Sequence, residues 1–193
     1  IYHLNKINRG YTSLINIWGA DHHGYIERIK SCIHAKNPNI KLTVILGQLV
    51  KLFKDGKQIK MSKRTGELIE LDEVIEEIGV DATRYFLVEK KADQPLDFDL
   101  TAAKEKNMEN PVYYIQYAHA RICTILKKTA PLTEKTTSVE LNDHDRKLKL
   151  IGSRYYDILL DAAATYEPYK IAQYLVELAR QFHSFYQECP IIY

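Results

Sequence analysis

Two short apolar runs, separated by a segment with helical periodicity, constrain the fold of this chain more than any other feature. The runs are Leu14–Trp18 and Leu42–Leu46, and each has the length of a strand. Between them, apolar side chains recur at helical spacing until Asn37-Pro38, where a helix is expected to end. Strand, glycine-containing loop, helix and strand together predict a βαβ unit with parallel strands and a right-handed crossover. We expect the first strand to be buried.

The hydrophobic periodicity changes from mixed to wholly helical near residue 110. Beyond this point the pattern predicts three helices, which begin near residues 110, 142 and 168. We expect the second of them to continue without a break to Ala162. The chain has 193 residues, enough for one large or two small domains. We therefore predict an α/β domain over residues 1–105 and an all-α domain over residues 106–193.

Composition narrows the class of protein. No apolar run approaches the roughly 20 residues of a membrane span, and the first residues show no signal-peptide pattern. The net charge of +2 is too small to indicate a nucleic-acid partner, so such a role needs local patches. Cys32, Cys123 and Cys189 are far apart without a CxxC pair, and we expect buried thiols in a reducing compartment. Because the chain starts at Ile1 rather than at Met, we interpret it as the interior of a longer protein.

One segment, Lys54–Glu67, is rich in cations and is called the lysine stretch below. Asp55-Gly56 within it is typical of a hairpin turn, because glycine tolerates the positive φ that a tight turn requires. Two ammonium groups, of Lys60 and Lys63, flank a hydroxyl at Ser62. Such groups suit a polyphosphate whose charge shifts during a reaction. The alternative is a basic loop that is simply solvated.

A second polar segment, Gly19-Ala20-Asp21-His22, directly follows the first predicted strand. Glycine at this place lets a ligand approach the backbone, and the carboxylate of Asp21 can accept hydrogen bonds from two ribose hydroxyls. The alternative is a turn in which Asp21 caps a helix. His22 and His23 lack an apparent third ligand, so we predict no metal site.

The helix expected from Asn110 carries two different faces. One is apolar, and the other holds Tyr114, Tyr117 and Arg121, followed by Thr124 and Lys128. A tyrosine stripe is commonly part of a core. The alternative is RNA binding, in which unpaired bases stack on aromatic rings and arginine contacts phosphate or a base edge. Because one apolar stripe is enough to pack a helix, we expect the second face to be free for such a role.

Three segments resemble known families. Lys60-Met61-Ser62-Lys63-Arg64 resembles the KMSKS signature of class I aminoacyl-tRNA synthetases, with Arg64 in place of the final serine. The segment from Ile17 to Tyr25 looks like the adenosine-side segment of arginyl-tRNA synthetases, and the segment from Asn110 to Arg121 is similar to the start of their anticodon-binding domain. The resemblance extends over nearly the whole chain in family order. It implies the second half of a Rossmann-like parallel-sheet catalytic domain, followed by an α-helical bundle of the DALR type that is truncated at its C-terminus.

The resemblance also implies roles for particular residues. It places the catalytic groups at Lys60, Ser62 and Lys63, the ATP contacts at Gly19, Asp21, Lys60, Met61 and Lys63, the L-arginine contact at His22, and the tRNA contacts at Tyr114, Tyr117 and Arg121. ATP would bind as a substrate together with Mg²⁺, without a metal site of the protein itself. The role of Arg64 stays open.

The implied activity is ATP-dependent formation of arginyl-adenylate and transfer of arginine to the 3′ end of tRNA(Arg) in the cytoplasm. His22-His23-Gly24-Tyr25 only superficially resembles the HxGH signature of the class, because the final histidine is lacking. We expect that signature in a missing N-terminal half, and expect the fragment to be inactive alone. One alternative is another class I synthetase of the cysteinyl type, although its zinc site is not found. The other is a non-catalytic tRNA-binding fragment or paralogue.

Overall fold

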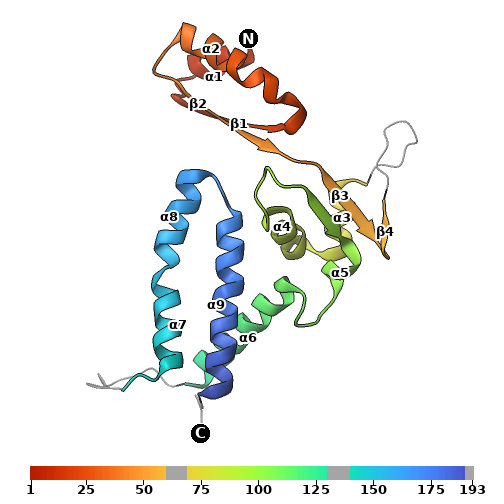
Figure 1. Cartoon of the computed structure of the whole chain (residues 1–193), viewed down its shortest axis with the longest axis vertical. Helices are drawn as coiled ribbons and strands as arrows, with labels where there is room; N and C mark the ends of the chain where they lie inside the picture. The colour runs from red at the N-terminus through yellow and green to blue at the C-terminus, as the bar shows by residue number, and fades with distance from the viewer. Residues whose placement is uncertain (60–68, 130–139, 190–193) are drawn as a thin grey trace. The chain divides into compact units, whose positions relative to one another are not determined.

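The computed structural model describes residues 1–59, 69–129 and 140–189, which form mostly helices with two small sheets (Figure 1). The chain divides into two compact units. Unit 1 combines Ile1–Lys51 with Lys90–Phe98, and unit 2 combines Leu52–Glu89 with Asp99–Tyr193. The two units are defined by which residues contact one another, whereas the predicted domains were defined by their type of secondary structure. The predicted domain boundary after residue 105 therefore stays a prediction.

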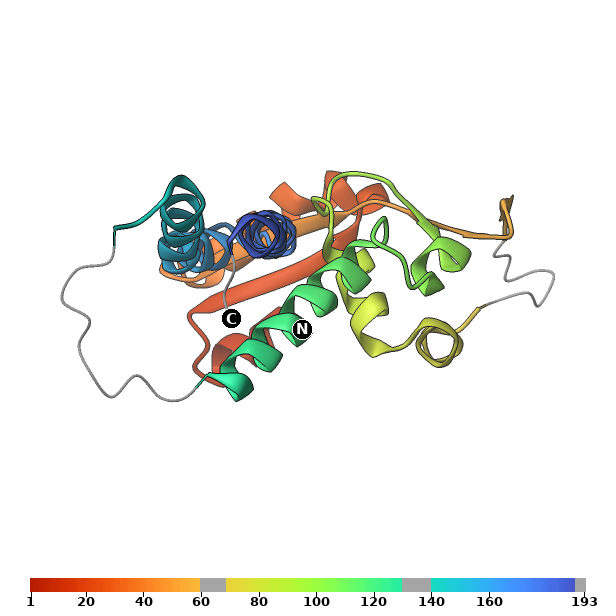
Figure 2. The same cartoon turned by 90° about the horizontal axis from the view of Figure 1, so that it is seen from below.

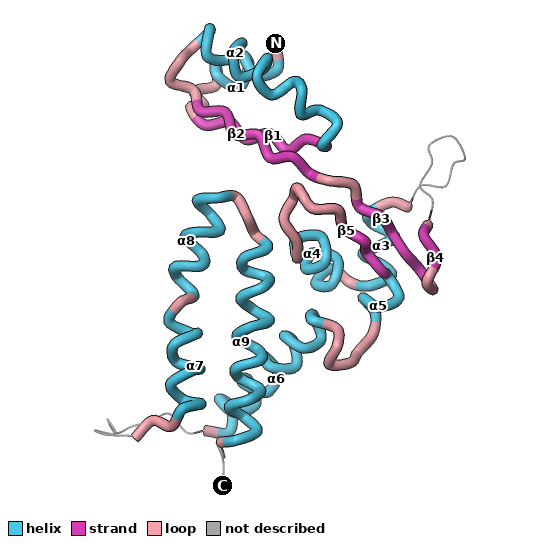
Figure 3. The backbone as a smooth tube through the Cα atoms, in the orientation of Figure 1, coloured by secondary structure: helices cyan, strands magenta, loops and turns pink. Residues whose placement is uncertain are grey.

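Unit 1 contains the predicted βαβ unit. Helix α1 (Tyr2–Asn8) precedes strand β1 (Ser13–Gly19), the 3₁₀ helix η1 (Ala20–Tyr25), helix α2 (Ile26–Lys36) and strand β2 (Lys41–Gly47). The two strands lie side by side (Figure 3); they are parallel, and their register runs from Ser13 opposite Lys41 to Gly19 opposite Gly47. Asn37 has extended backbone, as expected for a residue before proline, and this ends α2.

Strand β1 is buried on one face only. Leu14 and Asn16 are buried, whereas Ile15 is 45% exposed and Ile17 is 76% exposed. The amide nitrogen of Asn16 lies 2.8 Å from Nε2 of His3 in α1. The prediction of a buried strand was therefore wrong for Ile15 and Ile17. The apolar run has no alternation, so its pattern could not indicate which face is covered.

A second sheet has the strand order β4-β3-β5, with β3 at Val50–Lys54, β4 at Lys57–Gln58 and β5 at Leu96–Asp99. Strands β3 and β4 are antiparallel and are joined by Asp55 and Gly56, which have φ values of 51° and 72°. Two successive residues with positive φ form the hairpin turn that the Asp-Gly pair predicted. Helices α3 (Leu71–Ile78) and α4 (Val80–Val88) follow β4 in the chain, and α5 (Leu100–Lys104) follows β5.

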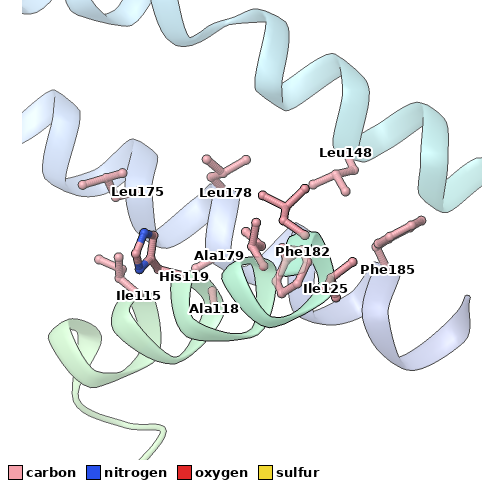
Figure 4. Close-up of a pocket in the computed structure, with 12 residues that line it drawn as sticks. Ile115, Ala118, His119, Ile125, Leu148, Leu175, Leu178, Ala179, Phe182 and Phe185 are labelled. Atoms are coloured by element: carbon pink, nitrogen blue, oxygen red, sulfur yellow. The ribbon is translucent and has the colours of Figure 1, made fainter. Parts of the chain in front are cut away.

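Four longer helices complete unit 2: α6 (Pro111–Lys128), α7 (Asp143–Ser153), α8 (Tyr155–Thr165) and α9 (Tyr169–Glu188). Helix α9 packs against the other three; it runs beside α7 and α8 and crosses α6 (Figures 1 and 2). Their core contains Ala118, Ala179 and Phe182. Next to it, apolar side chains of α6, α7 and α9 surround a hollow of about 460 Å³ (Figure 4). His119 lies on this apolar face, as the periodicity predicted.

The segment from Asn142 to Ala162 is two helices rather than the single predicted one. Asn142 caps α7 in a reciprocal capping box with Asp145. At the other end the backbone N–H of Arg154 bonds to Ile151 at 3.2 Å, a tighter turn than in an α-helix, and Arg154 separates α7 from α8. Gly152 has a low helix propensity, and the hydroxyl of Ser153 donates to the carbonyl of Leu150 at 2.8 Å. These local effects end α7, although the apolar spacing continues.

The expectation of buried thiols was also wrong. Cys32 is exposed, Cys123 and Cys189 are half-buried, and all of them are free. In α2 the buried residue is Ile33, the neighbour of Cys32, so the thiol points away from the covered side of the helix. The spacing of apolar residues along a helix indicates which side of the helix is buried, but it does not decide between two neighbouring residues such as Cys32 and Ile33.

Candidate functional site

A hollow of about 740 Å³ lies between α6, α9 and the segment that precedes α6. We call it the aromatic–basic groove, after the residues that give it its chemistry: Lys106, Tyr113, Tyr117, Arg121, Arg180 and His183. Among the described residues that line it there is no aspartate or glutamate. Cations without an opposing carboxylate make such a groove attractive to an anion.

The Tyr117 ring forms one wall of the groove. Its centroid lies 6.0 Å from that of Tyr113, with 12° between the planes, and 5.6 Å from that of His183, with 25° between the planes. Tyr113 is half-buried on the preceding turn of α6, while His183 comes from α9. These nearly parallel rings present flat faces of the kind on which an unpaired base can stack.

His183 is only 8% exposed and connects the two helices. Its Nε2 lies 3.4 Å from the carbonyl oxygen of Tyr114. Because a carbonyl oxygen only accepts, Nε2 carries the hydrogen in this contact. His183 therefore links α9 to α6 beside the Tyr117 ring.

Arg121 lies between two tyrosine rings. Its guanidinium carbon is 4.5 Å from the centroid of Tyr117 and 4.5 Å from that of Tyr186, and the guanidinium donates a hydrogen bond to the Tyr117 hydroxyl. A planar cation held over aromatic faces is stabilised by their quadrupoles. The guanidinium thus has a defined position at the groove, with N–H donors beyond the one that Tyr117 uses.

The expectation that the second face of α6 is free was wrong for its first half. Tyr114 packs against the core of Ala118, Ala179 and Phe182, and its ring centroid is 4.6 Å from that of His183. Tyr117 and Arg121 contact α9 as described above. Thr124 and Lys128, farther along the same face, are exposed. The face is therefore shared between packing and the groove, because α9 crosses only part of α6.

Sequence reasoning missed the contribution of α9 to the groove. Arg180, His183, Ser184 and Gln187 line it and follow the spacing i, i+3, i+4 and i+7, which places them on one helix face. That polar face flanks the apolar stripe of α9 and would have been a usable signal. Lys106 and Tyr113 were also missed, since neither belongs to the stripe of Tyr114 and Tyr117.

The glycine–aspartate segment lies in unit 1, where β1 ends. Gly19 is the last residue of β1, with φ −64° and ψ 150°, and a Cβ added to it would meet nothing within 4 Å. Neither backbone conformation nor crowding by neighbouring side chains explains a glycine here. The space beside Gly19 is open, as it is beside Gly24, so close approach of a ligand to Gly19 stays a prediction.

Asp21 and His22 follow in η1, and both are exposed. Neither η1 nor α2 has a side-chain hydrogen bond at its N-cap, so Asp21 is not the helix cap that the alternative interpretation required. The ring of His22 lies 5.9 Å from that of Tyr25, while Nδ1 of His23 lies 3.3 Å from the carbonyl oxygen of Ala20. The three predicted residues Gly19, Asp21 and His22 thus lie on one short segment at the end of β1 and the start of η1.

Lys60, Met61, Ser62, Lys63 and Arg64 lie outside the described residues, so their predicted roles stay predictions. The hairpin before them is described, and β4 ends at Gln58. Within residues 1–59, 69–129 and 140–189 no group of three or more histidine, cysteine, aspartate or glutamate side chains could hold a metal ion. No helix in the described part of the chain is long and apolar enough to cross a membrane.

Comparisons with known proteins show which proteins this chain is similar to. Residues 115–193 match the DALR anticodon binding domain. The chain is 48% identical over 193 residues to an arginine–tRNA ligase of Vesicomyosocius okutanii and 46% identical over 203 residues to one of Heliobacterium modesticaldum. Each alignment covers 99% of this chain, and it covers 34% and 36% of the two relatives respectively. The chain thus spans about a third of the length of these relatives.

Solved structures give the same result. A Campylobacter jejuni protein described as an arginyl-tRNA synthetase superposes with a TM-score of 0.85 at 40% identity, over 98% of this chain and 42% of that chain. The Thermus thermophilus arginyl-tRNA synthetase superposes with a TM-score of 0.72 at 20% identity, over 91% and 33% respectively, and shows similarity of fold.

Proposed function

We propose that the chain is part of an arginine–tRNA ligase, since 99% of it aligns with proteins of that name, and that the intact protein joins arginine to tRNA(Arg). Arginine and ATP would form arginyl-adenylate and pyrophosphate, and the arginyl group would then pass to the terminal ribose of the tRNA. The observation that carries this proposal is the 48% identity over 99% of the chain to a protein of that name. We place the reaction in the cytoplasm, as the resemblance implies.

The aromatic–basic groove is the part of the chain that we assign to the anticodon region of the tRNA. Tyr117, Arg121 and the groove residues of α9 lie in the segment that matches an anticodon binding domain, and the rings and cations of the groove suit single-stranded RNA. A base would stack on the tyrosine rings of the groove, Tyr117 among them, and Arg121 would contact phosphate or a base edge. Tyr114 would support the groove from the core side and hold His183 in place.

The nucleotide contacts that we propose lie in two segments. Gly19 would let the adenosine of ATP approach the end of β1, and Asp21 would accept hydrogen bonds from the ribose hydroxyls. Lys60 and Lys63 would hold the phosphates and stabilise the charge that develops on pyrophosphate as it leaves, with Ser62 and Met61 as neighbouring contacts. Mg²⁺ would enter bound to ATP, and its role would be to neutralise phosphate charge.

His22 would lie near the amino-acid substrate, since it follows the proposed ribose ligand directly. His22 is exposed, so a ligand can reach its side chain. Most contacts that select L-arginine would come from the part of the intact enzyme outside this chain. The missing N-terminal half is therefore the partner without which we expect no activation.

ATP–pyrophosphate exchange by the intact synthetase tests this proposal, with tRNA(Arg) present. Exchange should depend on arginine and should not occur with cysteine, which separates the arginine enzyme from the cysteinyl alternative. Asp21→Ala should raise the KM for ATP, whereas Asp157→Ala, which changes an exposed aspartate of α8, should not. The 193 residues alone contain no HxGH sequence, and we expect no exchange from them.

Absence of exchange by the intact protein would favour the other alternative, a non-catalytic tRNA-binding protein. Its distinguishing result is retained binding of the anticodon stem-loop without formation of arginyl-adenylate. The groove favours binding of RNA by a ligase and by a non-catalytic protein alike. The pyrophosphate-exchange assay, rather than a binding assay, therefore decides between these two functions.

A further inference from the structure

The hairpin β3–β4 has little support from its own strands. Strand β4 is 2 residues long, and the register of the two strands joins only Phe53 with Gln58 and Lys54 with Lys57. One further hydrogen bond runs from the amide of Ile59 to the carbonyl of Leu52 at 2.8 Å. Lys54 and Lys57 carry like charges directly opposite one another, which is unfavourable. Short hairpins of this kind are marginal unless other elements hold them.

Thr101, at the start of α5, holds the turn of the hairpin. The backbone N–H of Asp55 donates to the Thr101 hydroxyl oxygen at 2.8 Å, and this hydroxyl lies 3.2 Å from Oδ1 of Asp55, to which it donates. Asp55 is the turn residue with a φ of 51°, a left-handed conformation that aspartate adopts more readily than most residues other than glycine. Thr101 therefore binds both the main chain and the side chain of this turn residue.

Glu77 holds the end of β3. Its Oε1 lies 2.6 Å from Nζ of Lys54 in β3 and 2.7 Å from Nζ of Lys104 in α5. The hydrogen bonds from Lys104 and Lys54 lower the pKa of Glu77, and the bond to Glu77 raises the pKa of Lys54. All of these contacts lie within unit 2.

The position of Glu77 is not explained by its own helix. It is the second-last residue of α3, where the helix macrodipole disfavours a carboxylate, and the last turn contains no basic residue. A carboxylate at this place is stabilised by the two lysines instead. Glu77 is the point at which α3, β3 and α5 meet, and it also offsets the repulsion between Lys54 and Lys57.

The hairpin contacts matter because the hairpin is followed in the chain by the lysines of the lysine stretch. Lys60 follows the end of β4 by only two residues, so the elements that hold the hairpin also fix the point from which the rest of the lysine stretch departs. We propose that Glu77 and Thr101 are positioning residues for arginine activation, which hold the hairpin so that Lys60 and Lys63 meet the phosphates of ATP. This role rests on the proposed function. Neither residue is expected to touch the substrate.

The test uses isosteric variants. Glu77→Gln removes the charge that binds both lysines, and Thr101→Val removes the hydroxyl but keeps the shape. In the intact synthetase each should lower kcat for ATP–pyrophosphate exchange at least about tenfold, with the KM for arginine nearly unchanged, since a misplacement of about 1 Å can cost about a hundredfold. Thr101→Ser, which keeps the hydroxyl, should restore kcat.

A matched control and a second measurement separate positioning from general damage. Glu177→Gln removes a carboxylate from the ion pair with Arg154 on the exposed surface of the same unit, and it should leave kcat unchanged. In the 193-residue chain, hydrogen exchange of the amides from Phe53 to Gln58 should accelerate in Glu77→Gln and Thr101→Val, and not in Glu177→Gln.

Two results would overturn the proposal. Faster hairpin exchange with an unchanged kcat would show an anchor without a role in positioning, and unchanged exchange would show that the contacts do not hold the hairpin at all. If the wild-type synthetase itself shows no pyrophosphate exchange, the proposed function fails and the positioning role fails with it. That outcome is distinct, because the hydrogen-exchange result does not depend on any activity.

Discussion

Replacing Tyr117 by leucine should weaken RNA binding while leaving the chain folded. Stacking of one base on an aromatic ring contributes about 1–3 kcal/mol, so its loss should raise the Kd for the anticodon stem-loop about 5- to 150-fold. Tyr117→Phe keeps the ring and loses only the hydroxyl that accepts a hydrogen bond from Arg121. Its affinity should therefore stay much closer to that of the wild type.

The contacts of Tyr117 also set a cost in stability. Its ring loses the neighbours Tyr113 and His183, and the guanidinium of Arg121 loses one of two aromatic faces. Aromatic pairs contribute about 0.5–1.5 kcal/mol each and an exposed cation–π contact about 0.5–1 kcal/mol. Because leucine keeps part of the apolar burial, we expect the free energy of unfolding to fall by about 1–3 kcal/mol. Domains of this kind have about 5–15 kcal/mol to lose, so the variant should remain folded.

The assay is fluorescence anisotropy of a labelled anticodon stem-loop of tRNA(Arg), titrated with the 193-residue chain. Circular dichroism at the same temperature confirms that each variant is folded before its Kd is compared. Tyr156→Leu is the matched control, because it removes a tyrosine that is 65% exposed on α8 and does not line the groove. A folded Tyr117→Leu protein that binds as well as the wild type would refute the stacking argument. An equal loss of affinity in Tyr156→Leu would show that tyrosines outside the groove contribute as much.

Three further changes test two proposed ATP contacts and the stability of the chain at high pH. In the intact synthetase, Lys63→Ala should lower kcat for exchange by the equivalent of about 2–4 kcal/mol with little change in the KM for arginine, as steady-state kinetics can show. Gly19→Ala should raise the KM for ATP yet stabilise the 193-residue chain by about 0.4–1 kcal/mol in denaturant unfolding; Gly24→Ala, also without a close neighbour, is its control. Burial raises the pKa of Tyr85 to about 12, so its contribution to stability is complete below the unfolded pKa of about 10 and is lost as the pH rises toward 12. Unfolding measured from pH 8 to 12 should therefore show a smaller alkaline loss in Tyr85→Phe than in the wild type.

Local signals predicted the elements that depend on short-range chemistry. The parallel pair of strands followed from two apolar runs on either side of a helical pattern, and the hairpin followed from Asp55-Gly56. Signals that span a whole element were less informative. The apolar spacing continued through Gly152 and Arg154, so the break between α7 and α8 was missed, and the uniform run of β1 concealed the exposure of Ile17. Local backbone preferences ended α7, and the packing of only one face of β1 left Ile17 exposed. Hydrophobic periodicity carries information about neither effect.

The groove shows the same limit at the level of packing. The spacing of Tyr117 and Arg121 placed them correctly on one face of α6, but no spacing within a helix reveals which other helix will cover that face. The partner residues His183 and Tyr186 are more than 60 positions later in the chain, on a helix whose own apolar stripe already indicated that it would pack. Since α9 carries its polar residues beside that stripe, packing the stripe against α6 brings this polar face next to the tyrosines of α6. The role of a helix face is thus better predicted from all the helices of a domain than from one helix alone. When a second helix crosses only part of a face, as α9 does on α6, that face can serve both packing and binding.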